Sequence, residues 1–177
     1  DRLWEARKIW GAIINSSRMW GATVRSYVSN QFDSSATEQD LKEIHRILLY
    51  RHIAYLYILR SQLLIPTEWE HVNQSKFVRR LAEKRMKEVG VGLYNDDELE
   101  PKLEKYLEVT EMKRIIDYKN SATQLIDQQS QHLQMLRKQD KIDDFRHMEL
   151  QKILNDFYTH QGKAERIKKF PFPRQYG

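Results

Sequence analysis

Apolar residues recur at intervals of three and four through most of the chain, and this spacing is typical of amphipathic helices. Only six Gly and four Pro interrupt the pattern. It predicts long helices joined by short turns, at residues 2–32, 38–64, 73–88, 101–109, 111–138 and 142–161. The fold class expected from this pattern is all-α, a long-helix bundle that forms a single helical domain over residues 1–177.

Capping residues and helix breakers set the expected boundaries. Thr37, followed three residues later by Asp40, can cap the helix at 38–64, and Pro66 closes it. Thr110 can cap the helix at 111–138, and Gly162 is placed to end the last helix. We further expect a break at 89–92, acids at the start of the last helix, and an extended segment fixed by two later prolines (Asp143 and Asp144; Pro171 and Pro173).

The helix predicted at 111–138 carries a narrow seam with alternating spacings of three and four. The seam is apolar at both ends and polar in the middle: Ile115, Tyr118, Ala122, Leu125, Gln129, His132 and Leu136. Such a seam is typical of helix-to-helix packing in which the polar members fix the register. The sequence leaves open whether the facing helix belongs to the same chain or to another subunit.

The net charge of +5 raises the question of nucleic-acid binding, but the charge distribution argues against that partner. Seven acids and only two bases lie between Asp96 and Glu111, whereas the bases gather at the two ends of the chain. An excess of Lys and Arg beside a membrane span marks its cytosolic side. The chain itself has no uninterrupted apolar run of spanning length; the most apolar stretch, 47–59, contains Arg51 and His52.

Signs of catalysis or metal binding are weak. Without cysteine, thiolate nucleophiles and thiolate zinc sites are excluded. Asp143 and His147 share a helix face, but no second ligand pair stands at matching spacing, so capping is the favoured role. His45 and His52 are interpreted as a core or interface pair. No phosphate loop, dinucleotide fingerprint or nucleophile elbow is present. We expect neither an enzyme nor a bound cofactor or metal.

Four segments in sequence order resemble the bestrophin family. The tail is similar to its signature, with Gly162, Glu165, Arg166, Pro171, Pro173 and Tyr176 at the matching positions. The segments 142–150 and 156–159 are similar to bacterial members, 2–18 resembles the stretch after the second membrane span, and 50–60 a second cytosolic landmark. Ala164 stands where many relatives have Cys. The acidic calcium-binding loop of animal members lies outside this segment, so no calcium site carries over.

The resemblance implies a subunit of a homopentameric anion channel in the cell membrane, conducting inorganic anions such as chloride. This segment would be the cytosolic vestibule, with membrane spans before residue 1 and after residue 177. In the family an aperture residue lies on the helix before the signature, about four turns upstream, which makes Phe145 or Met148 the pore-aperture candidate. The alternative for both is an ordinary core contact. Two rival functions remain: an adaptor that binds a partner helix along the seam, and a helical metal enzyme using Asp143 and His147.

Overall fold

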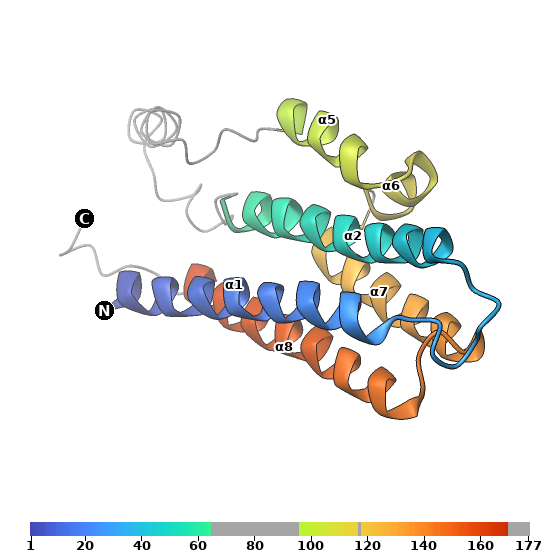
Figure 1. Cartoon of the computed structure of the whole chain (residues 1–177). Coiled ribbons are helices and arrows are strands. Elements are labelled where there is room, and N and C mark those ends of the chain that lie inside the picture. The colour runs from blue at the N-terminus through green and yellow to red at the C-terminus, as the bar shows by residue number, and fades with distance from the viewer. Residues whose placement is uncertain (65–95, 117, 170–177) are drawn as a thin grey trace.

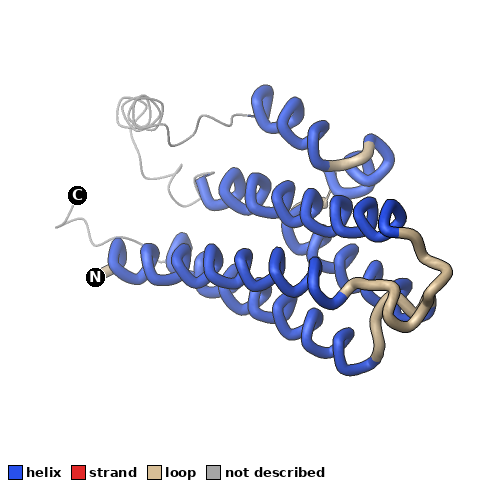
Figure 2. Tube along the Cα trace, in the orientation of Figure 1, coloured by secondary structure: helices blue, strands red, loops and turns tan. Residues whose placement is uncertain are grey.

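The computed structural model describes residues 1–64, 96–116 and 118–169. These residues form helices and connecting turns without a strand, which confirms the predicted all-α class (Figures 1 and 2). The described helices are α1 (Arg2–Tyr27), α2 (Glu38–Leu64), α5 (Asp96–Tyr106), α6 (Val109–Ile116), α7 (Ser121–Lys138) and α8 (Asp144–Lys169). None of them is long and apolar enough to cross a bilayer. The predicted helix at 73–88, the break at 89–92 and Pro66 lie outside the described residues.

The long helices pack side by side as a bundle. α1 contacts α8 and α2, α7 contacts both α2 and α8, and α5 covers the outer side of α2 (Figure 1). The core between them is aliphatic with a few aromatic rings, and its largest fully buried side chains include Trp20, Tyr55 and Phe157. The indole of Trp20 donates to the carbonyl oxygen of Leu48 at 3.3 Å, which satisfies its polar atom inside the core.

The first helix is shorter than predicted. α1 ends at Tyr27 rather than at residue 32, because Val28 adopts an extended conformation and buries its side chain. The backbone amide of Ser29 then donates to the carbonyl of Lys141 at 3.1 Å. A tertiary contact with a distant turn therefore ends the helical pattern early.

The helix predicted at 111–138 is two helices. Asn120 is the N-cap of α7, where its side chain accepts from the amide of Thr123 at 3.1 Å. The prediction that Thr110 is a cap was also wrong, because α6 begins at Val109 and Thr110 lies inside it. The short helix expected at 101–109 instead begins at Asp96 and contains Pro101.

Gly162 does not end the last helix. α8 continues to Lys169, so Gly162 lies within it. Glycine in a helix interior costs only about 1 kcal/mol relative to alanine, which packing can override. The residues flanking Gly162 supply that packing, because Gln161 and Glu165 both bond to Asn120 at the start of α7.

Two other capping predictions are confirmed. Thr37 and Asp40 form a reciprocal pair: each backbone amide donates to the other side chain at 3.1 Å. At the start of α8, Asp143 accepts from the amide of Arg146 at 2.8 Å. The capping role expected for Asp143, in preference to metal ligation, is what the structure shows.

Candidate functional site

The two aperture candidates lie one turn apart near the beginning of α8. Phe145 is 61% exposed and Met148 is 60% exposed, so both point away from the bundle. The interpretation of the two as ordinary core contacts is therefore wrong for this chain. Large apolar side chains exposed together on one helix face mark a surface that another molecule or a pore can use.

The corner that leads into α8 is a tight helix stop. Asp140 has a positive φ of 56°, in the left-handed region that non-glycine residues seldom adopt. The amide of Lys141 donates to the carbonyl of Leu136 at 3.0 Å, and that of Asp140 to Arg137 at 3.2 Å. These two bonds are a Schellman motif, and the buried side chain of Ile142 follows it. The corner thus fixes the direction in which α8 starts.

Arg146, which lies between the two candidates in sequence, ties α8 to the segment after α1. Its guanidinium donates to the carbonyl of Tyr27 at 3.0 Å, to the hydroxyl of Ser29 at 3.1 Å and to the side-chain oxygen of Gln31 at 2.6 Å. It also lies over the rings of Tyr27 and Phe32. Because Arg146 faces inward, Phe145 and Met148 are held outward on the opposite side of the same turn.

Ion pairs reinforce this corner. Lys141 donates to Asp33 at 2.8 Å, and Arg137 donates to Asp144 at 2.6 Å. The hydrogen bond from Lys141 is the main reason that the pKa of Asp33 is lowered to about 2. The hydrogen bond from Arg137 likewise lowers the pKa of Asp144. We call residues 28–37 and 139–146 together the loop end.

The signature residues within the described chain lie near the other end of α8. The carboxylate of Glu165 accepts from Asn120 at 3.2 Å and from Gln161 at 3.0 Å. Gln161 is buried and accepts from the hydroxyl of Tyr55 at 3.1 Å. Arg166 is exposed, and a Cβ added to Gly162 would meet no atom within 4 Å. Glu165 therefore joins α8 to the start of α7. The remaining signature positions, Pro171, Pro173 and Tyr176, lie outside the described residues.

The seam predicted on 115–136 packs inside this chain. Ile115, Ala122, Leu125, Gln129 and Leu136 are all buried, whereas Tyr118 is exposed. The amide of Gln129 donates to the carbonyl of Leu48 at 2.9 Å, so the polar middle of the seam binds α2. The facing helix thus belongs to the same chain.

A buried polar cluster at the middle of the seam was missed by sequence reasoning. Arg51 on α2 donates to the carboxylate of Glu111 at 2.5 Å and to the side-chain oxygen of Gln129 at 2.8 Å. Its Nη1 also lies 3.0 Å from Nδ1 of His132. Burial, with the charge of Arg51, lowers the pKa of His132 to about 4. The only signals were an arginine in the most apolar stretch and polar residues in the seam.

Two serine–histidine pairs lie between the helices, without the geometry of a nucleophile and its base. His52 Nε2 lies 2.8 Å from the hydroxyl of Ser17, and His160 Nε2 lies 3.2 Å from that of Ser16. The Ser17 hydroxyl already donates to the carbonyl of Ile13 at 2.7 Å, so it accepts from His52. Burial lowers the pKa of His52 to about 4. The hydrogen bond between His52 and Ser17 therefore satisfies buried polar atoms.

His45 and His52 are not paired with each other. His45 bonds to the carbonyl of Val28 at 2.7 Å, so it fixes the end of α1. In the described ranges, no three His, Asp or Glu side chains are grouped as a metal would require.

Comparison with known proteins identifies the family of this chain and structures with a similar fold. The sequence matches the family described as Bacterial/Fungal Bestrophin protein over residues 1–177. The fold resembles the crystal structure of a bacterial bestrophin homologue from Klebsiella pneumoniae, with a TM-score of 0.68 and 16% identity. The match covers 99% of this chain and 50% of that one, and a point mutant of the same homologue gives the same values. No curated protein matches the sequence. This chain spans about half the length of the solved relatives.

Proposed function

The chain belongs to the bacterial and fungal bestrophin family, and from this premise we propose that it forms the cytosolic vestibule of an anion-channel subunit. Chloride is the expected ion, and the expected assembly is a homopentamer in the cell membrane. The membrane spans would precede residue 1 and follow residue 177. The proposal assigns no chemical step and no cofactor to the chain.

The observation that carries the proposal is that the two ends of the described helical bundle meet. Arg2 at the start of α1 donates to the carbonyl of Ile167 near the end of α8, with Nε 3.1 Å from the oxygen. α1 and α8 run in opposite directions, so both connections leave from the same end (Figure 1). A domain inserted between two spans on one face of a bilayer needs this arrangement.

The aperture candidates lie at the opposite end of α8. Phe145 and Ile167 are separated by 22 helical residues, or about 33 Å along the helix at about 1.5 Å per residue. A ring of five such side chains would therefore form a constriction deep in the vestibule rather than beside the bilayer. An apolar ring restricts ion flow by size and by dewetting. Phe145 and Met148 suit this role because both are exposed on a turn that Arg146 holds in place.

The preference for anions would come from the summed basic charge. The net charge is +5 per chain, and five copies around one axis would add their potentials in the enclosed water. The proposal needs no single anion-binding residue. It predicts that anion selectivity weakens as salt screens the potential.

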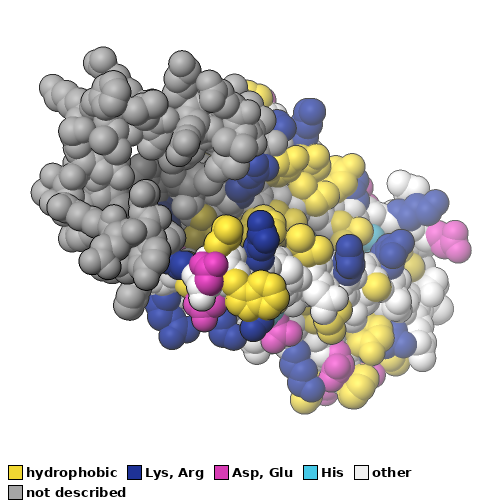
Figure 3. All heavy atoms as spheres, turned by 90° about the vertical axis from the view of Figure 1, so that its left-hand side faces the viewer, with side chains coloured by type: hydrophobic (Ala, Val, Ile, Leu, Met, Phe, Trp, Pro, Cys, Tyr) yellow, Lys and Arg dark blue, Asp and Glu magenta, His cyan; other side chains and the backbone are white. Residues whose placement is uncertain are grey.

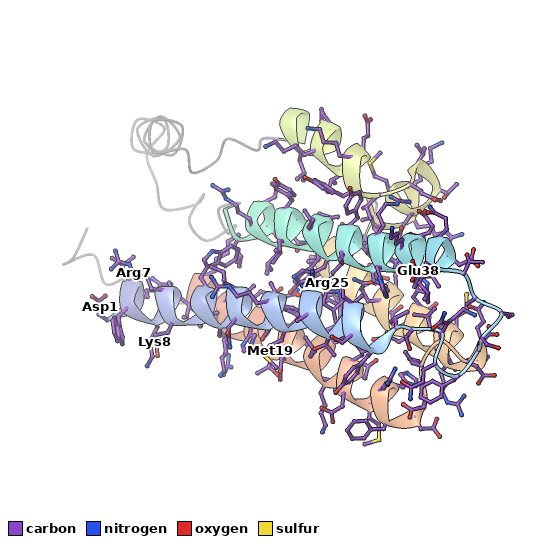
Figure 4. All side chains as sticks on the ribbon, viewed as in Figure 1. Asp1, Arg7, Lys8, Met19, Arg25 and Glu38 are labelled. Carbon is purple, nitrogen blue, oxygen red and sulfur yellow. The ribbon has the colours of Figure 1, made fainter. Side chains whose placement is uncertain are left out.

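Anion flux tests the proposal. The complete gene product is reconstituted in liposomes, and flux is measured beside Phe145→Ala and Met148→Ala. We expect at least one substitution to change conductance or anion selectivity, because it widens the apolar ring. Met19→Ala is the matched control, since Met19 is also an exposed methionine but lies on α1 (Figure 4). Flux that none of the substitutions alters would remove the aperture assignment, and absence of any flux would remove the channel proposal.

The adaptor alternative is not favoured, because most of the seam that a partner helix would bind is not exposed. Most of the seam at 115–136 is buried against α2 within the same chain, and Gln129 is bonded there. A partner helix could reach it only if the bundle opened. The metal-enzyme alternative is not favoured either, because Asp143 caps α8.

A further inference from the structure

Several side chains in the first turns of α1 are left exposed by the described part of the chain. Residues 3–8 are all exposed, and among them Leu3 is 59% exposed and Trp4 is 61% exposed. Trp20, by contrast, is fully buried in the core. Among the described residues nothing buries these tryptophan and leucine side chains, so they require a different explanation from core packing.

Exposed bases lie at the same end of the bundle as these apolar side chains. Arg7 and Lys8 lie on α1, and Lys163 and Arg166 lie on the end of α8 that packs beside it. In the part of the chain that the structure describes, no carboxylate lies within ion-pair distance of these four bases. Asp1, Glu5 and Glu165 are the nearby acids in sequence, and Glu165 already accepts from Asn120 and Gln161, so positive charge remains in excess. Figure 3 shows this end, where Lys and Arg side chains and some Asp and Glu side chains lie around apolar ones.

We propose that this basic end, defined as Leu3, Trp4, Arg7, Lys8, Lys163 and Arg166, binds the anionic phospholipid headgroups of the membrane surface. Trp4 and Leu3 would enter the interfacial layer, where indole rings are favoured because one side is apolar and the other is wet. Lys8 lies 5.7 Å from the centre of the Trp4 ring, so charge and ring are presented together.

Charge complementarity favours lipid over a second copy of the chain. Two basic ends that met each other would bring like charges together, whereas phosphate groups supply the opposite charge at high surface density. The inference rests on the proposed function, because it needs this end to face the bilayer. It goes further in naming the lipid class and the residues that select it.

Vesicle binding tests the inference. The 177-residue chain is mixed with vesicles of phosphatidylcholine alone or with about one-third phosphatidylglycerol, and the bound fraction is measured by sedimentation. Each base near an anionic surface contributes roughly 1 kcal/mol, which is about fivefold in partitioning. Because the double variant loses two bases, we expect Arg7→Gln/Lys8→Gln to bind phosphatidylglycerol vesicles about 25-fold more weakly. Circular dichroism verifies that it is folded.

The matched control removes the same charge from the opposite end of the bundle. Lys42 and Lys138 are exposed and lie at the start of α2 and the end of α7. Lys42→Gln/Lys138→Gln is expected to bind like the unmodified chain. Equal losses in the two double variants would overturn the inference, because net charge alone would then explain binding. Binding of the unmodified chain that persists in about 1 M salt would also overturn it, since screening is then nearly complete.

Fluorescence quenching by brominated lipids locates the apolar contact. We expect the quenching to fall in Trp4→Phe, because Trp4 is exposed, whereas Trp10 on the same helix is partly buried and Trp20 is fully buried. Quenching that Trp4→Phe leaves unchanged would overturn the assignment of Trp4 to the interface. These readouts are independent of ion flux: flux without preference for phosphatidylglycerol would remove only this inference, and the preference without flux would remove only the channel.

Discussion

The two ends of the bundle are built differently. At the loop end, and on the last turn of α7 beside it, three bases have partners: Lys141 is paired with Asp33, Arg137 with Asp144, and Arg146 with three acceptors. At the basic end Arg7 and Lys8 lie on an exposed stretch of α1 with no described carboxylate in reach (Figure 4). Among the described residues, the loop end supplies counter-charges for Lys141 and Arg137, whereas Arg7 and Lys8 have none within ion-pair distance.

This difference is consistent with the two roles proposed above. An apolar constriction must hold its side chains in place without help from outside, and the bonded corner around Arg146 can do so for Phe145 and Met148. A surface that meets a bilayer needs its charges free to bind phosphate. The comparison predicts a large cost for substitutions in the core, a moderate cost at the loop end and almost none at the basic end.

The largest loss of unfolding free energy is expected for a substitution in the middle of the bundle. Glu111→Ala leaves the buried guanidinium of Arg51 without its counter-charge, and such a loss costs about 3–5 kcal/mol of unfolding free energy. Urea denaturation measures it. Glu43→Ala, which breaks the exposed pair with Arg46, is the matched control and should cost less than about 1 kcal/mol. Similar costs for the two would show that burial does not control these energies.

Acidification should weaken the core before it weakens the loop end. The pKa of buried His52 is about 4 in the folded chain, against its usual 6.5. As pH falls from 6.5 to 4, the unfolded chain binds a proton that the folded chain refuses, so stability falls by on the order of 3 kcal/mol. His52→Gln should reduce the dependence of the urea midpoint on pH in that window by about half, because His132, whose pKa is also about 4, responds in the same window.

The contribution of the loop end to stability is lost at lower pH, and a variant of Asp33 tests it. The pKa of Asp33 is about 2, below its usual 3.8, so its contribution is present above pH 3.8 and is lost as pH falls toward 2. Asp33→Asn should therefore flatten the curve only below pH 4. If Asp33→Asn instead altered the window between 6.5 and 4, the assignment of the two windows would be wrong.

A smaller loss of unfolding free energy is expected for a substitution of Arg146. Arg146→Ala removes hydrogen bonds to Tyr27, Ser29 and Gln31, which should cost about 1–3 kcal/mol in urea denaturation. In liposomes the same variant should broaden the conductance levels, because the turn with Phe145 and Met148 loses its anchor. Arg146→Lys keeps the charge but not the fork of donors, and it should restore stability only in part.

The smallest effect is expected at the basic end. Arg7→Ala should change the unfolding free energy by less than about 0.5 kcal/mol, because the exposed side chain has no described partner to lose. Thermal unfolding monitored by circular dichroism is a sufficient measurement. A loss as large as that for Arg146→Ala would contradict the comparison between the two ends.

Sequence reasoning correctly placed the start of a helix where neighbouring residues alone form the cap. The box of Thr37 and Asp40 fixes the start of α2, and Asp143 fixes that of α8, because each cap needs only residues three positions apart. It failed where a distant contact decided the outcome. α1 stops at Tyr27 because the next residues bond to the α7–α8 corner, and Gly162 stays helical because its neighbours bind Asn120.

The candidate site shows the same difference between features readable from nearby residues and features that depend on distant contacts. The order of the family segments was readable along the chain, and so was the spacing that singled out Phe145 and Met148. Their exposure was not, because the same apolar spacing suits a core contact and a surface pair equally well. The cluster around Arg51 was missed because Glu111 and His132 lie 60 and 81 residues away from it.

The sequence by itself determined the helical class, the starts of α2 and α8 and the family, since each depends on residue spacing or on short-range hydrogen bonds. Only the tertiary structure decided which apolar residues are buried, which helix the seam faces and that the start of α1 meets the end of α8. Those outcomes depend on long-range packing, in which every side chain competes for a limited interior and each buried polar group must find its partner.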